Sequence, residues 1–260
     1  IFAVIITAMA TKIKQILQKV PRNAVLFSSW LSKNGIDRKE QTSYVRSGWI
    51  ERISQGVYKF AGETPTVYSI LSSYNSQLYK RTHIGASTAL DVRGYSHFVA
   101  MGKPLAYIFS SKNQRIPSWF EKGEWDMSVW YFSSSAFGET EVGLEMMMID
   151  GSQVLLSSPE RAFMECLHLS PVNYSLMDLY YVMEMLTTLR PKLVQELLEA
   201  CTSVKVKRLF LYMAEKSGHS WFKAINTGVI ALGSGKRVCA TNGKYIGKYD
   251  ITIPRELADY

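Results

Sequence analysis

Histidine and cysteine side chains are the first candidates for chemistry in this sequence of 260 residues. Cys166 and His168 stand two positions apart in a segment expected to be helical, so their side chains point to different faces. A cysteine nucleophile with a histidine base is therefore not predicted, and a core cysteine beside a helix-end histidine explains the pair better. None of the four histidines has the spacing of a metal ligand, and they are His83, His97, His168 and His219. No metal site and no cofactor are predicted.

Acidic side chains offer a second kind of chemistry, the binding of Mg²⁺ in a nuclease. Glu139, Glu141 and Glu145 could supply carboxylates, but no D-x-D or E-x-K spacing accompanies them, and an exposed acidic loop is the simpler interpretation. The GSGK run superficially resembles a phosphate-binding loop. A Walker A motif would need glycine at Ile230 and serine or threonine at Arg237. No enzyme is predicted from these residues.

A third chemistry, hydrogen bonding to nucleic acid, is favoured by the polar and basic residues that follow Asp37. A DNA major groove admits one helix, whose exposed side chains must offer hydrogen bonds to base edges and cations to phosphates. In the helix expected here, Val45 faces inward and Gln41 borders the same face. The side chains left for DNA contact are Arg38, Lys39, Thr42, Ser43 and Arg46. Those expected on or beside the following hairpin are Arg52, Gln55 and Lys59.

The elements that must position these side chains form a winged helix-turn-helix from Ala24 to Ala61. A helix over Ala24–Lys33 carries apolar residues at three-to-four spacing, and the Asn-Gly pair that follows ends it. Asp37, with Glu40 three positions later, is a capping-box pair that starts the second helix.

A hairpin completes the motif. Two β-prone runs, Trp49–Ser54 and Val57–Phe60, are joined at Gln55-Gly56 and would form the wing. A helix over Thr11–Val20 is expected to pack behind the motif. The same fold also serves as an adaptor between proteins, and a small helical packing domain with a solvated charged face would share the pattern. DNA binding is favoured because the second helix is polar and basic.

Composition agrees with a polyanionic partner. The formal net charge is +8 and the pI about 9.3, while 47% hydrophobic and 20% charged residues describe a folded globular chain. Three scattered cysteines without a C-x-x-C pair argue against a disulfide framework and predict a cytoplasmic protein. The apolar opening run is too short to span a bilayer. Met9 is the expected original start, with residues 1–8 a non-native extension.

A loop of turn formers, Gly62–Pro65, is the expected boundary between a winged domain at 1–62 and a larger C-terminal domain at 66–260. The second domain mixes helices and strands, so the predicted fold class is α+β. Its predicted helices are Thr66–Tyr79, Gly85–Val92, one that starts at Ser158-Pro159, Leu176–Leu186, Pro191–Ala200 and Val204–Lys216. Its predicted strands are Leu105–Ser110, Met127–Phe132, Leu144–Ile149, Gln153–Leu156 and a final hairpin of Lys236–Thr241 with Lys244–Tyr249.

Longer strings of the sequence resemble one protein family. They are SSWLSKNGIDRKEQTSYVRSGWIERISQGVYKFAG in the N-terminal part, RTHIGASTALDVRGYSHF and LSSPERAFMECLHLSP further on, and the segment from RLFLYMAEKSGHSWF to ITIPREL. In this order they resemble the AbiEi-type antitoxins of type IV toxin-antitoxin (abortive infection) systems, also described as transcriptional regulators of viral defence. The resemblance covers nearly the full chain from Met9, and the GWIERISQGVY wing is its most distinctive part.

The resemblance implies a non-enzymatic repressor and antitoxin. Its winged domain would bind inverted repeats in the double-stranded DNA of its own promoter. Its C-terminal domain would counter a nucleotidyltransferase-like toxin, without necessarily forming a stable complex with it. No antitoxicity residue carries over, and the candidates are simply cations of that domain, Arg161, Lys205, Lys207 and Arg208. The last three lie in the first turn of a helix, where cations are unfavourable unless an anion is near, and a solvated basic end is the alternative.

Two other functions stay open. A stand-alone winged-helix transcriptional regulator would use its C-terminal domain to sense a ligand or to oligomerise, with no toxin involved. A DNA-processing enzyme would use the winged domain for targeting and the glutamates near Glu141 for catalysis. A neighbouring gene for a nucleotidyltransferase favours the antitoxin, and metal-dependent cleavage that is lost on changing those glutamates favours the enzyme.

Overall fold

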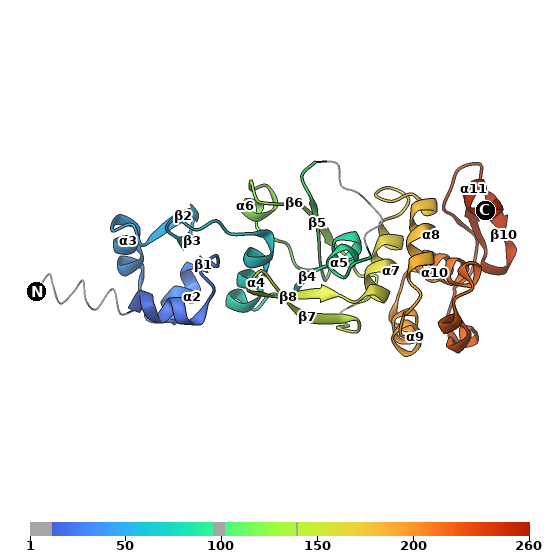
Figure 1. The fold of residues 1–260 in the computed structure, drawn as a ribbon, viewed down its shortest axis with the longest axis horizontal. Helices are drawn as coiled ribbons and strands as arrows, with labels where there is room; N and C mark the ends of the chain where they lie inside the picture. The colour runs from blue at the N-terminus through green and yellow to red at the C-terminus, as the bar shows by residue number, and fades with distance from the viewer. Residues whose placement is uncertain (1–11, 96–101, 139) are drawn as a thin grey trace, which may run out of the picture.

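The computed structural model describes residues 12–95, 102–138 and 140–260; the expected extension at 1–8, His97 and Glu139 lie outside this range. Its layers follow one another along the longest axis of the molecule (Figure 1). The winged domain lies at one end, a five-stranded sheet in the middle, and helices with a three-stranded sheet at the other end. This mixture confirms the α+β class. No helix of the described ranges is long and apolar enough to cross a membrane.

The winged domain contains the predicted helices and hairpin. Residues 12–19 form its first helix, and the other elements are strand β1 (Val25–Phe27), helices α2 (Ser28–Lys33) and α3 (Arg38–Arg46), and strands β2 (Ile50–Ser54) and β3 (Val57–Phe60). β3 pairs antiparallel with both other strands, so the sheet order is β1-β3-β2. The hairpin of β2 and β3 forms the wing.

The prediction for residues 25–27 is wrong, because the helix predicted over Ala24–Lys33 begins at Ser28. β1 lies between two hydrophobic cores. Leu26 belongs to the core of the winged domain, whereas Val25 and Phe27 belong to the larger core. Since successive side chains of a strand point to opposite sides, a strand covered on both sides carries an unbroken apolar run. Periodicity does not separate such a run from a buried helix.

Helix α4 (Val67–Leu78) fastens this strand to the C-terminal domain. One edge of β1 pairs with β3. At the other, the Gln77 side chain accepts a hydrogen bond from the Phe27 amide (3.0 Å) and donates one to the Val25 carbonyl (2.7 Å), as a neighbouring strand would. The Ser73 hydroxyl accepts from the Val25 amide at 3.1 Å. The predicted domain boundary lies in the loop between β3 and α4, and these contacts cross it.

The central sheet has the strand order β6-β5-β4-β8-β7. β4 runs antiparallel to β5 and parallel to β8, while β5 and β6 are parallel and β7 and β8 antiparallel. The predicted Asp150-Gly151 turn has both residues at positive φ, 47° and 75°, which suits a tight hairpin. The strands are β4 (Thr82–Ile84), β5 (Leu105–Ser110), β6 (Ser128–Ser133), β7 (Leu144–Ile149) and β8 (Ser152–Ser157).

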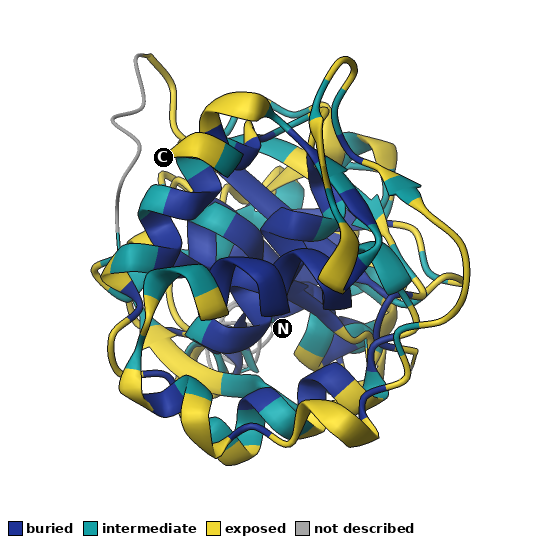
Figure 2. Ribbon diagram, turned by 90° about the vertical axis from the view of Figure 1, so that its right-hand side faces the viewer, coloured by how far each residue is buried: buried dark blue, intermediate teal, exposed yellow. Residues whose placement is uncertain are grey.

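Helices cover the sheet and form the next layer. α5 packs against α7, and α7 packs against α8, α9 and α10. The Ser158 hydroxyl caps the Arg161 amide and Pro159 stands in the first turn, which confirms the predicted start of α7. Seen from the C-terminal end, buried segments gather at the centre of the molecule (Figure 2). The helices are α5 (Ala86–Val92), α6 (Ser118–Glu121), α7 (Pro159–Leu169), α8 (Leu176–Met185), α9 (Pro191–Ala200) and α10 (Val204–Ser217).

The chain ends in a small three-stranded sheet, and the predicted final hairpin is wrong. β9 (Arg237–Val238) and β10 (Lys244–Ile246) do not pair with each other. β11 (Ile251–Ile253) lies between them, parallel to β9 and antiparallel to β10. Short 3₁₀ turns at 220–224, 227–229 and 247–249 and helix α11 (Arg255–Asp259) complete the fold.

Candidate nucleic-acid interface and C-terminal cavity

Helix α3, the candidate DNA-reading helix, begins with the predicted capping box. The Asp37 carboxylate accepts a hydrogen bond from the Glu40 amide at 2.9 Å, and the Glu40 carboxylate accepts one from the Asp37 amide at 3.0 Å. Lys12 of the first helix pairs with Glu40 and donates to the Gly35 carbonyl at 3.1 Å. These contacts fix the start of α3 against the turn before it.

The inner face of α3 is fixed by Gln41, which is 1% exposed. Its amide nitrogen donates to the carbonyls of Ser28 (3.1 Å) and Ile36 (2.9 Å), and its oxygen accepts from the Ser28 hydroxyl (2.6 Å). This satisfied amide joins α2 to α3. Val45 packs partly buried against the winged core, as predicted, but the main apolar anchor is Tyr44, which the sequence pattern did not single out.

The outer face of α3 carries the predicted DNA-contacting side chains. Arg38, Lys39, Thr42 and Arg46 are exposed, and Ser43 is partly buried. The Thr42 hydroxyl donates to the Arg38 carbonyl at 2.9 Å, so it is held against its own helix. Three cations and two hydroxyl side chains thus stand on a helix whose other faces are anchored. Their contact with DNA stays a prediction.

The three candidate DNA-contacting residues of the wing differ in their exposure and in their partners. Arg52 and Gln55 are exposed, whereas Lys59 is partly buried. The Lys59 Nζ lies 3.0 Å from Glu51 Oε2 and donates to the Glu63 carbonyl at 2.9 Å. The hydrogen bond from Lys59 lowers the pKa of Glu51. Lys59 would therefore have to leave this pair to reach a phosphate, while Arg52 and Gln55 would not.

The cationic candidates of the C-terminal domain are not gathered on the surface. Lys205 donates to two backbone carbonyls at the end of α7. Lys207 and Arg208 are 6% and 2% exposed, and both donate to backbone carbonyls within residues 231–235. Carbonyl dipoles, rather than an external anion, therefore offset these charges at the start of α10. Arg161, the fourth candidate, lines a cavity.

This cavity lies at the central sheet and has a volume of about 310 Å³, at the lower end of the range for small-molecule sites. Charged and aromatic side chains line it together. Arg81 and Glu141 form an exposed ion pair among its lining residues. Phe109 and Phe137 contribute to its apolar part.

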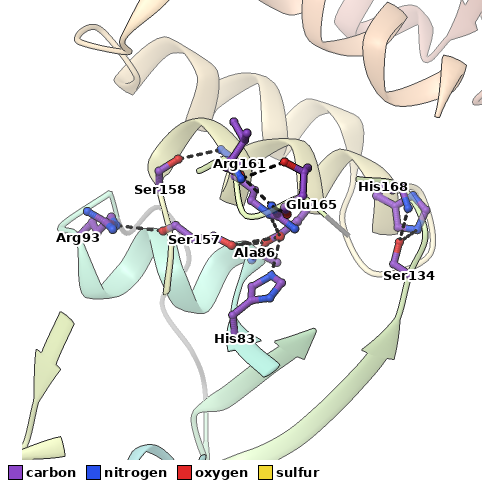
Figure 3. A network of polar contacts seen from close by, with 12 residues as sticks. His83, Ala86, Arg93, Ser134, Ser157, Ser158, Arg161, Glu165 and His168 are labelled. Carbon is purple, nitrogen blue, oxygen red and sulfur yellow. Dashed lines mark hydrogen bonds and ion pairs between the residues drawn. The ribbon is translucent and has the colours of Figure 1, made fainter. Parts of the chain in front are cut away.

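Glu165 lines the cavity, and its carboxylate is the centre of a network of polar contacts (Figure 3). It is 2% exposed and accepts hydrogen bonds from His83 Nε2 (2.8 Å), Arg161 Nε (3.1 Å), the Ser157 hydroxyl (2.9 Å) and the Ala86 amide (3.0 Å). Burial raises the pKa of Glu165, but the charge and hydrogen bond of His83, with the other donors, outweigh burial and lower it. The carboxylate is therefore ionised in a fully partnered site.

The backbone beside Glu165 is built around this carboxylate. A Cβ at Gly85 would lie 2.2 Å from Glu165 Oε2 and 2.7 Å from the Phe109 ring, so no side chain fits there. Ala86 has φ of 48°, a left-handed conformation that costs roughly 1 kcal/mol or more for an L residue. Sequence reasoning missed this site. The i, i+4 spacing of Arg161 and Glu165 was a local signal, but it did not identify His83 as their partner.

The residues considered for catalysis have structural partners. Glu141 pairs with Arg81, and Glu145 pairs with Arg93 (2.7 Å) and Arg190 (2.9 Å). Burial raises the pKa of Glu145, but the arginines outweigh it and lower the pKa. Within the described ranges, no group of three His, Cys, Asp or Glu residues is placed to hold a metal ion.

Cys166 and His168 lie on different faces of α7, as predicted. Cys166 is fully buried, and burial raises the pKa of its thiol well above the ordinary value. His168 lines the cavity instead, with Nε2 3.2 Å from the Ser134 hydroxyl (Figure 3). Because the thiol stays protonated and His168 lies on another face of the helix, the two residues do not form a cysteine nucleophile with a histidine base.

Comparisons with known proteins identify a family for the chain and a solved structure with a similar fold. The solved structure of the RV2827C protein from Mycobacterium tuberculosis is similar in fold, with a TM-score of 0.58 and 14% identity over 95% of this chain and 91% of that chain. No protein with a curated description matches. A family model for the N-terminal domain of AbiEi antitoxin transcriptional regulators matches residues 9–101, and a second, described as transcriptional regulator, AbiEi antitoxin, type IV TA system, matches residues 103–254. Because the two matches cover nearly the whole length, the chain belongs to the AbiEi antitoxin family of transcriptional regulators of type IV toxin-antitoxin systems.

Proposed function

We propose that this protein is a cytoplasmic DNA-binding antitoxin that represses its own operon and counteracts a nucleotidyltransferase-like toxin. The observation that carries the proposal is the exposed cationic and hydroxyl face of α3, on a helix fixed by its capping box and by Gln41. In winged helix-turn-helix proteins this helix enters the major groove. Arg38, Lys39 and Arg46 would bind phosphates or guanine edges, and Thr42 and Ser43 would hydrogen-bond to bases. Arg52, Gln55 and Lys59 of the wing would contact the DNA backbone.

Binding of the full chain to its own upstream DNA across a salt series tests the DNA-binding part. The triple variant Arg38→Ala, Lys39→Ala, Arg46→Ala is expected to lose specific binding. Each phosphate contact that it loses should flatten the dependence of log K on log salt by about 0.9, because fewer counterions are released. The variant Thr42→Ala should instead lose about 1–3 kcal/mol at one operator position and little on random DNA.

A matched control removes the same charge elsewhere. Lys103, Lys192 and Lys223 are exposed residues of the C-terminal domain, and their triple alanine variant should bind the operator like wild type. Equal loss in both triple variants would mean that net charge, not α3, carries the affinity. If wild type bound its upstream DNA no better than random DNA, autoregulation would be refuted.

The antitoxin part is tested by growth rescue. Family membership supports a toxin partner, and we assign the antitoxic activity to the C-terminal domain. Co-expression of the full chain with a nucleotidyltransferase encoded beside its gene should restore growth. The triple variant of α3, expressed from an unrelated promoter, should restore growth equally well. Intact operator binding without rescue would favour the stand-alone transcriptional regulator.

A further inference from the structure

The cavity at Glu165 contains a charged group that the proposed DNA contacts leave unexplained. Arg161 is 5% exposed and is held on several sides. Its Nε donates to Glu165 (3.1 Å), its Nη1 donates to the carbonyls of Thr140 (2.9 Å) and Val142 (2.8 Å), and its guanidinium lies 4.8 Å from the Phe137 ring centroid. The position of this guanidinium is therefore fixed before any ligand arrives.

One nitrogen of this guanidinium, Nη2, is available to donate a hydrogen bond to an occupant of the cavity. Arg161 lines the cavity, and Nη2 donates to no residue of the described ranges. Since Glu165 already accepts hydrogen bonds from four groups, its charge is partnered within the wall. An oxygen acceptor of an occupant would complete the hydrogen bonding of Arg161.

A second cation, Arg81, can leave its ion pair with Glu141 and bind an occupant of the same cavity. Arg81 also lines the cavity and pairs with Glu141, but the two side chains are 71% and 58% exposed. Such an exposed pair is weak, so an anionic occupant can take Arg81 from Glu141 at little cost. Two guanidinium groups facing one space match a carboxylate or a phosphate, because these oxyanions bind arginine through charge-assisted hydrogen bonds.

Apolar side chains share the lining with these polar groups and limit the kind of occupant that fits. Phe109, Phe137, Leu144 and Leu155 line the cavity beside these polar groups. A volume of about 310 Å³ admits one compact molecule rather than a polymer. Apolar walls of this kind favour an occupant that carries a hydrocarbon or aromatic part.

We propose that this cavity binds a small organic oxyanion, a carboxylate or a phosphate monoester with a compact apolar body, through Arg161 Nη2 and Arg81. Glu141 competes with the occupant for Arg81, and Glu165 with His83 holds Arg161 in place. Binding here does not depend on the DNA contacts of α3.

Calorimetric titration of the full chain with benzoate and with phenyl phosphate tests the proposal. At least one probe should bind saturably at one site per chain. Arg81→Gln should weaken this binding about tenfold or more, since a charged hydrogen bond is lost. Glu141→Gln should strengthen it about two- to fivefold, because the competitor for Arg81 is removed. Both substitutions are at exposed side chains, so the fold is expected to survive them.

Controls separate this site from other anion binding. Lys192→Gln, at an exposed lysine outside the cavity, and the triple alanine variant of α3 should bind the probes like wild type. The proposal is overturned if neither probe binds saturably, if Arg81→Gln binds as tightly as wild type, or if Glu141→Gln weakens binding. It is also overturned if benzyl alcohol binds as well as the anions, or if inorganic phosphate binds as well as phenyl phosphate.

Discussion

Replacing Glu165 by glutamine is expected to lower the free energy of unfolding by about 3–5 kcal/mol, because it removes the charge that pairs with a buried arginine. Glutamine keeps the shape but puts an NH₂ group where the carboxylate accepts from His83, Arg161, Ser157 or the Ala86 amide. At least one donor then faces another donor. Urea unfolding of the full chain, followed by fluorescence and circular dichroism, measures the change.

Acid stability provides a second readout of the same group. The pKa of Glu165 in the folded chain lies below its ordinary value of 4.5. A carboxyl with a depressed folded pKa contributes stability that is present above the unfolded pKa and is lost as the pH falls through the folded pKa. Wild type should therefore lose its advantage over Glu165→Gln as the pH falls below about 4.5.

An exposed glutamate is the control for this prediction. Glu196 is exposed on α9, and Glu196→Gln should change the free energy of unfolding by less than about 0.5 kcal/mol. Equal urea midpoints for the variants at positions 165 and 196 would contradict the structural role of the buried carboxylate. So would a pH dependence that Glu165→Gln leaves unchanged.

Local spacing explains which parts of the candidate DNA interface were predictable. Asp37 and Glu40 are three positions apart, so their capping box depends on one turn of chain and was correctly predicted. The exposed positions of Arg38 and Arg46 follow from the same helical period. The pairing of Lys59 with Glu51 was not predicted, because it depends on the register of β2 against β3.

Long-range packing explains the errors. β1 was predicted as part of a helix because both of its faces are apolar, and the second core comes from a domain that follows it in sequence. The prediction of a final hairpin was wrong because β11, a strand of three residues, lies between β9 and β10 in the sheet. The site at Glu165 combines β4, α5, β8 and α7, and no local pattern brings His83 to Glu165, which lies 82 positions later.

The helix-dipole rule is correct that the cations at the start of α10 need negative partners, but it does not identify these partners. It indicates that Lys205, Lys207 and Arg208 need negative partners near the start of the helix. The partners are backbone carbonyls, and those of Arg208 come from residues that lie 24 to 42 positions away. A rule that considers one helix cannot supply them.

Replacing Arg208 by methionine is expected to lower the free energy of unfolding by at least about 3 kcal/mol, because it removes four hydrogen bonds from a charged group, each worth about 1.5–3 kcal/mol. The guanidinium donates to the carbonyls of Leu232 (2.9 Å), Gly233 (3.1 Å), Gly235 (2.6 Å) and Asp250 (3.0 Å). These bonds hold the GSGK loop and the turn before β11 against α10. Urea unfolding measures the loss, and faster proteolytic cleavage within residues 231–250 would locate it.

The variants Arg208→Lys and Lys192→Met separate a structural role from a toxin-facing one. One ammonium cannot replace a planar guanidinium among four acceptors, so lysine should recover only part of the lost stability. Methionine at the exposed position 192 should change stability by less than about 0.5 kcal/mol. In the structural role, growth rescue by Arg208→Met falls with the fraction of folded protein and returns at lower temperature. Loss of rescue with an unchanged urea midpoint would instead place Arg208 in an antitoxic surface and contradict its role in the fold.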